Sequence, residues 1–294
     1  LAAIHRMAEA RQRLADASAI ADGDESLVKP VLLAEAELAT RQGDFRRALV
    51  VLDELHRIAH AMKDDHEKHR VALHLAQSHA AMGDRITALA HHQGAAHLLL
   101  DDRTAALERM KVRALIDYFT RDFLAAAQHS EKAIDLGREM GLTYEVMLNL
   151  HHLGQTLVQL EDLPRAYGAV GQSLALCEEC GDERFANYNR MLLAFLDGLQ
   201  GTVDGEKLLR QGIAYAEAKG FTSDVIGGRL LLANLLFRVG RSETARAEYR
   251  TTRELASGAG HRLIADECQI ALSMLDAGEN THRDRRLESA SSGE

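Results

Sequence analysis

Two cysteines three residues apart, Cys177 and Cys180, form the motif in this sequence that comes nearest to a reactive site. A Cys-x-x-Cys pair does redox chemistry beside a strand–helix–strand unit, and it binds zinc when further ligands complete a set of four. No strand pattern surrounds this pair, and the third cysteine, Cys268, lies far along the chain without an evident fourth ligand. We therefore expect Cys177 and Cys180 to be packing residues of a helix.

Histidine is frequent, with 15 copies, and His56 and His60 have the i, i+4 spacing that puts both on one helix face. Such a pair can bind a metal ion, and a His-Glu-x-x-His motif would add a catalytic base. That motif is missing, because His66 and His69 stand too close together around Glu67. We predict surface or structural roles and no metal site, with adventitious metal binding as the alternative.

Other catalytic motifs are missing from the sequence. It contains no phosphate-binding loop, nucleophile elbow or calcium loop, and its glycine-rich stretch at 198–205 has no flanking strand. No nucleophile stands with a matching base in a recognisable motif. We predict that the chain is not an enzyme and binds no cofactor.

Composition narrows the class of protein further. The chain has 294 residues, 46% of them hydrophobic, with two prolines and no tryptophan, which favours helix throughout. A net charge of −9 offers no basic face for general nucleic-acid binding. The longest apolar run, 225–237, is too short to cross a bilayer. Three cysteines are too few for a disulfide framework, so we expect a cytoplasmic protein. Because residue 1 is leucine rather than methionine, we also expect the chain to be a piece of a longer protein.

Small residues recur every 38 to 40 positions, and this repeat carries most of the information in the sequence. One series is Ala36, Ala76, Ala114, Gly154, Ala194 and Ala233. A second series, 11 or 12 residues later in each unit, is Ala48, Ala88, Ala126, Ala166, Gly205 and Ala245. A third, at the end of each of the last four units, is Gly141, Gly181, Gly220 and Gly260.

The repeat has a direct physical explanation. Two antiparallel helices joined by a short turn approach closely only where a small side chain faces the partner helix. A glycine after a helix adopts the left-handed conformation that ends it. One helix pair cannot bury its own apolar face, so pairs stack into an all-α solenoid. We predict a truncated repeat at 1–22, six helix pairs at 23–260, a capping helix at 261–277 and a flexible tail at 278–294.

Residues 149–182 are the segment that most resembles a tetratricopeptide repeat. Gly154, Leu157 and Ala166 fall on the small, large and small positions of that family, around the turn Glu161-Asp162. The standard repeat has 34 residues, whereas this one has about 40. It thereby resembles the long-repeat branch found in maltose-regulator-type bacterial activators, Leu-Gly-Asn adaptors and quorum-peptide receptors. Two departures are the missing tryptophan and a slipped glycine-rich turn in the fifth repeat.

The resemblance implies a right-handed superhelix whose concave wall is built from the first helix of every pair. Side-chain amides on that wall bind the backbone of an extended peptide in this family. Carrying the register across gives a set of partner-binding positions: Glu37, Arg41, Arg70, Gln77, Lys111, Tyr118, His151, Gln155, Tyr188, Phe195, Asn234 and Arg238. An apolar residue on these helices is more often core than groove, so core packing remains the alternative for each of them.

These features predict a scaffold that binds a protein or peptide, as the docking or regulatory module of a larger bacterial signalling protein. One alternative is a self-associating structural scaffold, in which the end repeats form a homo-oligomer. Another is the ligand-sensing segment of a transcription regulator. The size of the protein in solution distinguishes a self-associating scaffold from a scaffold that binds a partner. A DNA-binding domain elsewhere in the full protein would favour the transcription regulator.

Overall fold

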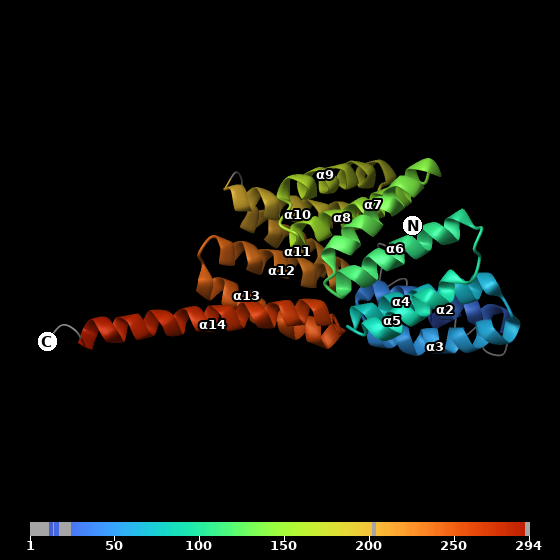
Figure 1. Ribbon diagram of the computed structural model, residues 1–294, viewed down its shortest axis with the longest axis horizontal. Helices are drawn as coiled ribbons and strands as arrows, with labels where there is room; N and C mark the ends of the chain where they lie inside the picture. Colours follow the sequence, from blue (N-terminus) through green and yellow to red (C-terminus); the bar gives the residue numbers. More distant parts are fainter. Residues whose placement is uncertain (1–11, 14, 18–24, 202–203, 292–294) are drawn as a thin grey trace.

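The computed structural model describes residues 12–13, 15–17, 25–201 and 204–291, and all regular structure in those ranges is α-helical (Figure 1). For residues 25–27, 41–42, 62 and 278–291 it describes the backbone alone. The helices are α2 (Glu25–Gln42), α3 (Phe45–Met62), α4 (Asp65–Ala81), α5 (Arg85–Ala96), α6 (Arg103–Phe119), α7 (Phe123–Glu139), α8 (Thr143–Gln159), α9 (Leu163–Cys180), α10 (Glu183–Gln200), α11 (Gly205–Lys219), α12 (Thr222–Arg238), α13 (Ser242–Ala259) and α14 (Arg262–Ser291).

Consecutive helices pack side by side as pairs, from α2 with α3 to α12 with α13, and α14 packs against α13. The twelve small residues that predicted these pairs are all buried at the helix crossings. At Gly154 a Cβ atom would lie 2.4 Å from Val170 Cγ2, so the close approach of α8 and α9 requires glycine there. The predicted all-α repeat architecture is confirmed.

Each pair is bounded by local signals that the sequence carries. Aspartates such as Asp44 and Asp162 accept a hydrogen bond from a first-turn N–H, which satisfies a donor that the helix leaves open. Gly141, Gly181, Gly220 and Gly260 have φ between 68° and 80°, as the left-handed helix ends require.

The two ends of the array touch. Helix α2 contacts α12, and the Phe45 ring at the start of α3 lies 4.9 Å from the His261 ring, centroid to centroid. A Cβ on Gly43, whose φ is 78°, would stand 2.5 Å from His261 Nε2 and 2.6 Å from Ser223 Oγ. The first pair therefore rests on the end of the sixth, and the helices form a closed ring rather than an open strip.

The truncated repeat at 1–22 lies almost entirely outside the described residues. The last helix was expected to end at 277, but α14 continues to Ser291 and projects beyond the ring (Figure 1). Its extension is polar yet contains no proline and several strong helix formers, so nothing in the backbone chemistry stops the helix at 277.

The apolar core divides the molecule unequally. One continuous cluster runs through α7 to α14, from Ala127 to Leu275. The helices α2 to α6 hold three smaller, separate clusters. Among the described residues, no helix combines the length and apolar character needed to cross a membrane.

Candidate partner-binding site

The inner wall of the ring contains a hollow of about 240 Å³ where α8, α10, α12 and α14 converge. We call it the inner hollow. Its lining residues are Val158, Gln159, Glu161, Leu163, Phe195, Leu199, Asn234, Phe237, Arg238, Tyr249, Glu267, Ile270, Ala271 and Met274. Phe195, Asn234 and Arg238 were predicted for partner binding, and the structure brings these three together here.

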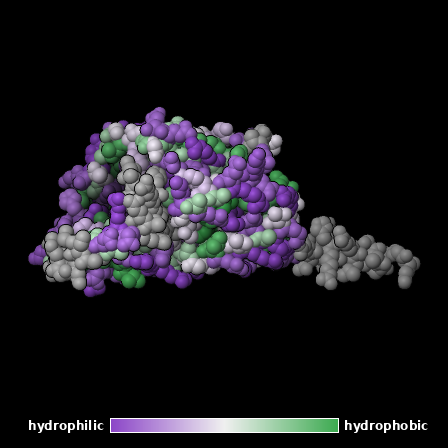
Figure 2. All heavy atoms as spheres, turned by 180° about the vertical axis from the view of Figure 1, so that it is seen from behind, coloured by the Kyte–Doolittle hydropathy of each residue, from purple (hydrophilic) through white to green (hydrophobic). Residues whose placement is uncertain are grey.

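The apolar side of the inner hollow faces solvent. Ile270 and Met274 on α14 expose 50% and 60% of their surface, and Phe237 on α12 is also exposed. Apolar exposure that gathers around one hollow is typical of a contact surface for a partner. Figure 2 shows one face of the molecule on which hydrophilic residues dominate and hydrophobic ones form small separate patches.

The polar side of the inner hollow is a short hydrogen-bond network. The Tyr249 hydroxyl donates to Asn234 Oδ1 at 2.6 Å, and Asn234 Nδ2 donates to Glu267 Oε1 at a long 3.4 Å. The Gln159 side chain bonds both Glu267 and Tyr118. Burial raises the pKa of the Glu267 carboxyl, against the opposing effect of these hydrogen bonds and of Arg121 at longer range.

Deeper along the same wall, tyrosines and glutamine fill the centre of the ring. Gln155 bonds the side chains of Tyr188 and His152. Burial raises the pKa of both the Tyr118 and the Tyr188 hydroxyl, so both stay neutral donors. The Tyr188 hydroxyl lies against Gly227 of α12, where an added Cβ would stand only 2.1 Å from it.

The other end of the inner wall carries charges that pair with one another. Arg70 bonds Glu67 at 2.7 Å, and Lys111 on α6 forms an ion pair with Glu145 on α8. His74 lies among these groups with its pKa lowered, chiefly by burial. Glu37 and Gln77 are half-buried nearby, while the side chain of Arg41 lies outside the described residues.

The structure buries His151, which was one of the residues predicted for partner binding. It is buried between α8, α9 and α10, where its Nδ1 hydrogen-bonds Asn189 Oδ1 at 2.7 Å and its ring contacts those of Phe185 and Tyr188. Burial lowers the pKa of His151 to about 4, so it is neutral at ordinary pH. Gln155 lies four residues further along the same face of α8 and is less buried, so neighbouring helices rather than the helical period distinguish the two residues.

Glu267, Ile270 and Met274 were missed because the register was not extended into the last helix. Ser273 is the position on α14 that is equivalent to the small residues of the earlier pairs. Glu267 stands six residues before it, Ile270 three residues before it and Met274 one residue after it. Tyr188 stands six before Ala194, and Asn234 stands one after Ala233. The spacing that identified the inner wall in the pairs therefore also identifies it in α14.

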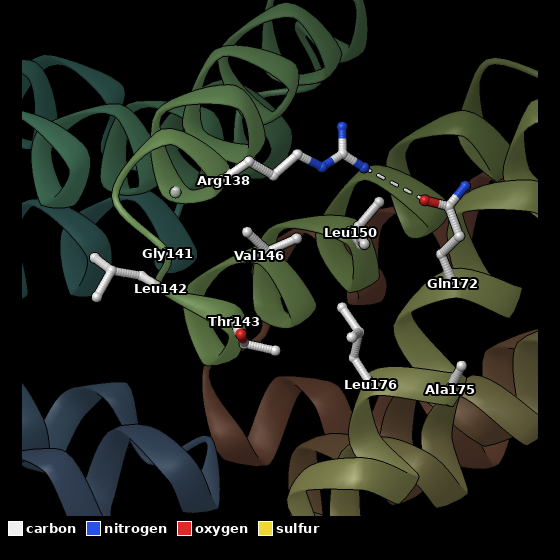
Figure 3. A pocket seen from close by; sticks show the side chains of 10 residues that line it. Arg138, Gly141, Leu142, Thr143, Val146, Leu150, Gln172, Ala175 and Leu176 are labelled. Atoms are coloured by element: carbon white, nitrogen blue, oxygen red, sulfur yellow. Dashed lines mark hydrogen bonds between the residues drawn. The ribbon is translucent and has the colours of Figure 1, made fainter.

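A second depression, the outer groove, runs between α7 and α9 on the opposite side of α8. Its two parts have volumes of about 470 and 510 Å³ and share Arg138, Leu150 and Gln172. Figure 3 shows Val146 and Leu150 on its floor, with Arg138 reaching across to Gln172, where the donor–acceptor distance is 3.4 Å. An ion pair between Arg165 and Glu131 also crosses it, so its polar rims bind each other.

The residues singled out as chemically reactive are dispersed. Cys177 is buried as expected and burial raises the pKa of its thiol to about 11, but Cys180 is exposed, so the packing interpretation is wrong for that residue. The rings of His56 and His60 lie 4.4 Å apart on α3. Within the described part of the chain no group of three or more His, Cys, Asp or Glu side chains is placed to hold a metal ion.

Comparison with known proteins identifies the fold. No protein-family model and no curated protein matches the sequence. A Rap protein complexed with competence and sporulation factor has a TM-score of 0.62 at 16% identity, covering 92% of this chain and 85% of that one. A signal-transduction ATPase with a tetratricopeptide repeat sensor, from Pyrococcus horikoshii, has a TM-score of 0.54 at 15% identity, covering 92% and 43%. The apo form of RapI has a TM-score of 0.54 at 10% identity, and the match covers 86% of this chain and 99% of that one. The chain thus has the fold of tetratricopeptide-type helical repeat proteins.

Proposed function

We propose that this chain is a protein- or peptide-binding scaffold of the tetratricopeptide type, and that the partner occupies the inner hollow. The proposal makes it the docking or regulatory module of a larger bacterial signalling protein in the cytoplasm, belonging to the branch with repeats of about 40 residues. Its fold alone would not identify a function, since helical repeats serve many. The local chemistry of the inner hollow carries the proposal.

The observation that carries it is the meeting of solvent-facing apolar side chains with buried hydrogen-bonding groups. Ile270 and Met274 offer apolar contact, which supplies most of the affinity at interfaces. Asn234 donates one hydrogen bond and accepts one within the chain, which leaves an N–H and a lone pair for the backbone of an extended segment. A partner that lost water at this site would therefore regain its hydrogen bonds.

Two of the similar structures support this use of the fold. The Rap protein was crystallised in complex with competence and sporulation factor, and the archaeal ATPase carries its repeats as a sensor. The outer groove gives less support, because the polar groups on its rims already bind one another across it.

The test is capture of a partner from lysate by the intact chain and by two matched double variants. Ile270→Lys/Met274→Lys places charges in the inner hollow, where exposure of 50% and 60% keeps the fold intact. Ile86→Lys/Leu124→Lys makes the same change at residues that are 84% and 63% exposed outside it. We expect a protein captured by the intact chain and by the second variant to be lost from the first.

Equal capture by both variants would place the binding surface elsewhere and contradict the proposal. A variant of the polar side, Gln155→Ala/Asn234→Ala, extends the test to the amides. Its helicity must match that of the intact chain, because Asn234 also accepts the Tyr249 hydroxyl.

A further inference from the structure

We infer that the inner hollow recognises a basic side chain, arginine or lysine, of the bound segment, with the carboxylate of Glu267 as its counter-ion. This inference rests on the proposed function and names the chemistry of its partner. It follows from the position of Glu267, from the groups around it and from the absence of a cation beside it within the described residues.

Glu267 is a carboxylate among neutral groups. It lies on α14 in the lining of the inner hollow, next to the amides of Asn234 and Gln159 and the hydroxyls of Tyr118 and Tyr249. Amides and phenols solvate a carboxylate in part, but they do not neutralise it. When Glu267 is ionised, its neutral neighbours therefore leave its charge for a cation of the partner to balance.

The basic side chains nearest to Glu267 either lie too far away for a direct ion pair or are paired with another acid. Within the described residues, no Lys, Arg or His nitrogen lies within 4 Å of its carboxylate, and Arg121 acts on it at longer range. Arg238, which also lines the inner hollow, forms an ion pair with Glu161. The arrangement leaves one acidic position without a direct counter-ion in a site that is otherwise bonded internally.

Three other carboxylates on the first helices of the pairs have a direct counter-ion. Glu145 on α8 pairs with Lys111, Glu67 on α4 with Arg70, and Asp224 on α12 with Arg184 at 2.7 Å. A half-buried carboxylate without such a partner costs stability, because it loses hydration without regaining an opposite charge. Burial raises the pKa of Glu267, as this loss requires. A partner that supplied the cation would recover the cost on binding.

The shape of the inner hollow fits a single long side chain. Its volume of about 240 Å³ is below the range of about 300–1,000 Å³ that is typical of sites for whole small molecules. Phe195, Leu199 and Ile270 can cover an aliphatic stem while the charged end reaches Glu267. The exposed aromatic ring of Phe237 adds a surface on which a cation is also stabilised.

The experiment selects random 12-residue peptides displayed on phage against the intact chain, then measures synthetic peptides in solution. Binding peptides should be enriched in arginine or lysine. Replacing that arginine by citrulline, which keeps the shape and removes the charge, should weaken binding to the intact chain at least tenfold. On the Glu267→Gln variant the same replacement should weaken binding only about twofold, because the arginine and Glu267 act as a pair and one partner is already missing.

Asp266→Asn is the matched control. Asp266 is the preceding residue on α14, but it is exposed and lies 3.8 Å from Arg262, away from the inner hollow. It should leave the citrulline effect unchanged. Peptides without basic residues, or an equal citrulline effect on the intact chain and on Glu267→Gln, would overturn the inference. If those peptides still require Ile270 and Met274, the proposed function stands; a library without any binder would overturn both.

Stability gives a second readout that needs no ligand. Because the charge of Glu267 lacks a direct counter-ion, Glu267→Gln should raise the urea midpoint of the free chain while Asp266→Asn leaves it unchanged. A lower midpoint for Glu267→Gln would mean that the carboxylate is a structural acceptor, and it would contradict the role inferred here.

Discussion

The two halves of the inner wall differ in the polar residues that they carry. In the half built from α4, α6 and the start of α8, charges pair inside the chain, as Lys111 does with Glu145. In the half built from the end of α8, α10, α12 and α14, the polar groups are mostly amides and phenols, and the acid Glu267 has no direct counter-ion among the described residues. The difference separates polar residues that hold the scaffold from polar residues that keep bonding capacity for a partner.

The apolar core follows the same division. One large cluster, with a small one beside it around Met147, supports the half with the inner hollow, whereas only small separate clusters support the other half. A site that leaves Ile270 and Met274 exposed and Glu267 without a counter-ion loses stability locally. The larger core beneath it compensates for that loss.

The largest expected effect comes from the buried ion pair that joins α10 to α12 in the half with the inner hollow. Arg184 Nε and Nη2 bond Asp224 at 2.8 and 2.7 Å, with side chains 10% and 9% exposed. Arg184→Ala leaves the Asp224 carboxylate buried alone and should cost about 3–5 kcal/mol of unfolding free energy in urea titrations.

Arg190→Ala is the control for that prediction. It removes an ion pair with Glu178 in which both side chains are 56% exposed, and it should cost less than about 1 kcal/mol. Equal losses for the two variants would mean that the buried pair contributes no more than a surface pair.

The pH dependence of stability is the second expected effect. Burial lowers the pKa of His151 and of His261 to about 4, below the ordinary value of 6.5. The unfolded chain then binds more protons between these values, so stability falls as pH drops from about 6.5 to 4, by at most about 1.4 kcal/mol per pH unit per histidine. Urea titrations at several pH values measure the slope.

A His151→Leu variant sharpens this prediction. The variant loses the bond to Asn189 and is less stable at every pH, but its stability should depend less on pH. An unchanged slope would show that His151 gains its proton in the folded state as easily as in the unfolded one.

A smaller effect is expected where the halves touch. Gly43→Ala should destabilise through its left-handed backbone and through the clash of the new Cβ with His261 and Ser223. Gly181→Ala has the same backbone conformation, with φ of 70°, but its Cβ would meet nothing within 4 Å. We expect about 1 kcal/mol for Gly181→Ala and about 1–3 kcal/mol more for Gly43→Ala. Equal costs in thermal unfolding would show that the contact between the ends yields easily.

The smallest effect is expected in the half with internal pairing. Lys111→Met keeps the apolar stem and removes the partly exposed ion pair with Glu145, so it should cost about 1 kcal/mol or less. Partner capture should not change. Loss of capture with unchanged stability would break the distinction between the halves, because it would make Lys111 a contact residue, as the sequence alone predicted.

The fold was predictable because close helix packing leaves a direct trace in the sequence. Small residues at 38 to 40 residue intervals mark the crossings, and glycines such as Gly181 mark the helix ends. The turn at Glu161 shows the limit of that rule, since a non-glycine residue there adopts φ of 58°. A short turn between tightly packed helices imposes the left-handed conformation even without glycine.

The site was predictable only in part, for two physical reasons. His151 and Gln155 stand four residues apart on one helix face, so the helical period assigned both to the inner wall although neighbouring helices bury His151. The inner hollow also needs α14, whose polar composition beyond 277 drew attention away from Glu267 and Met274. Contacts between the first and last pairs leave no periodic signal, since His261 meets Phe45 across most of the chain.

The contact of Gly43 and Phe45 with His261 changes how this molecule should come apart. An open stack of helix pairs behaves as a one-dimensional zipper, which frays from either end while its middle stays folded. Here each end protects the other, so neither pair is a free starting point for fraying. Hydrogen exchange should therefore be slowed together in α3 and at the start of α14, and a deletion at one end should loosen the other.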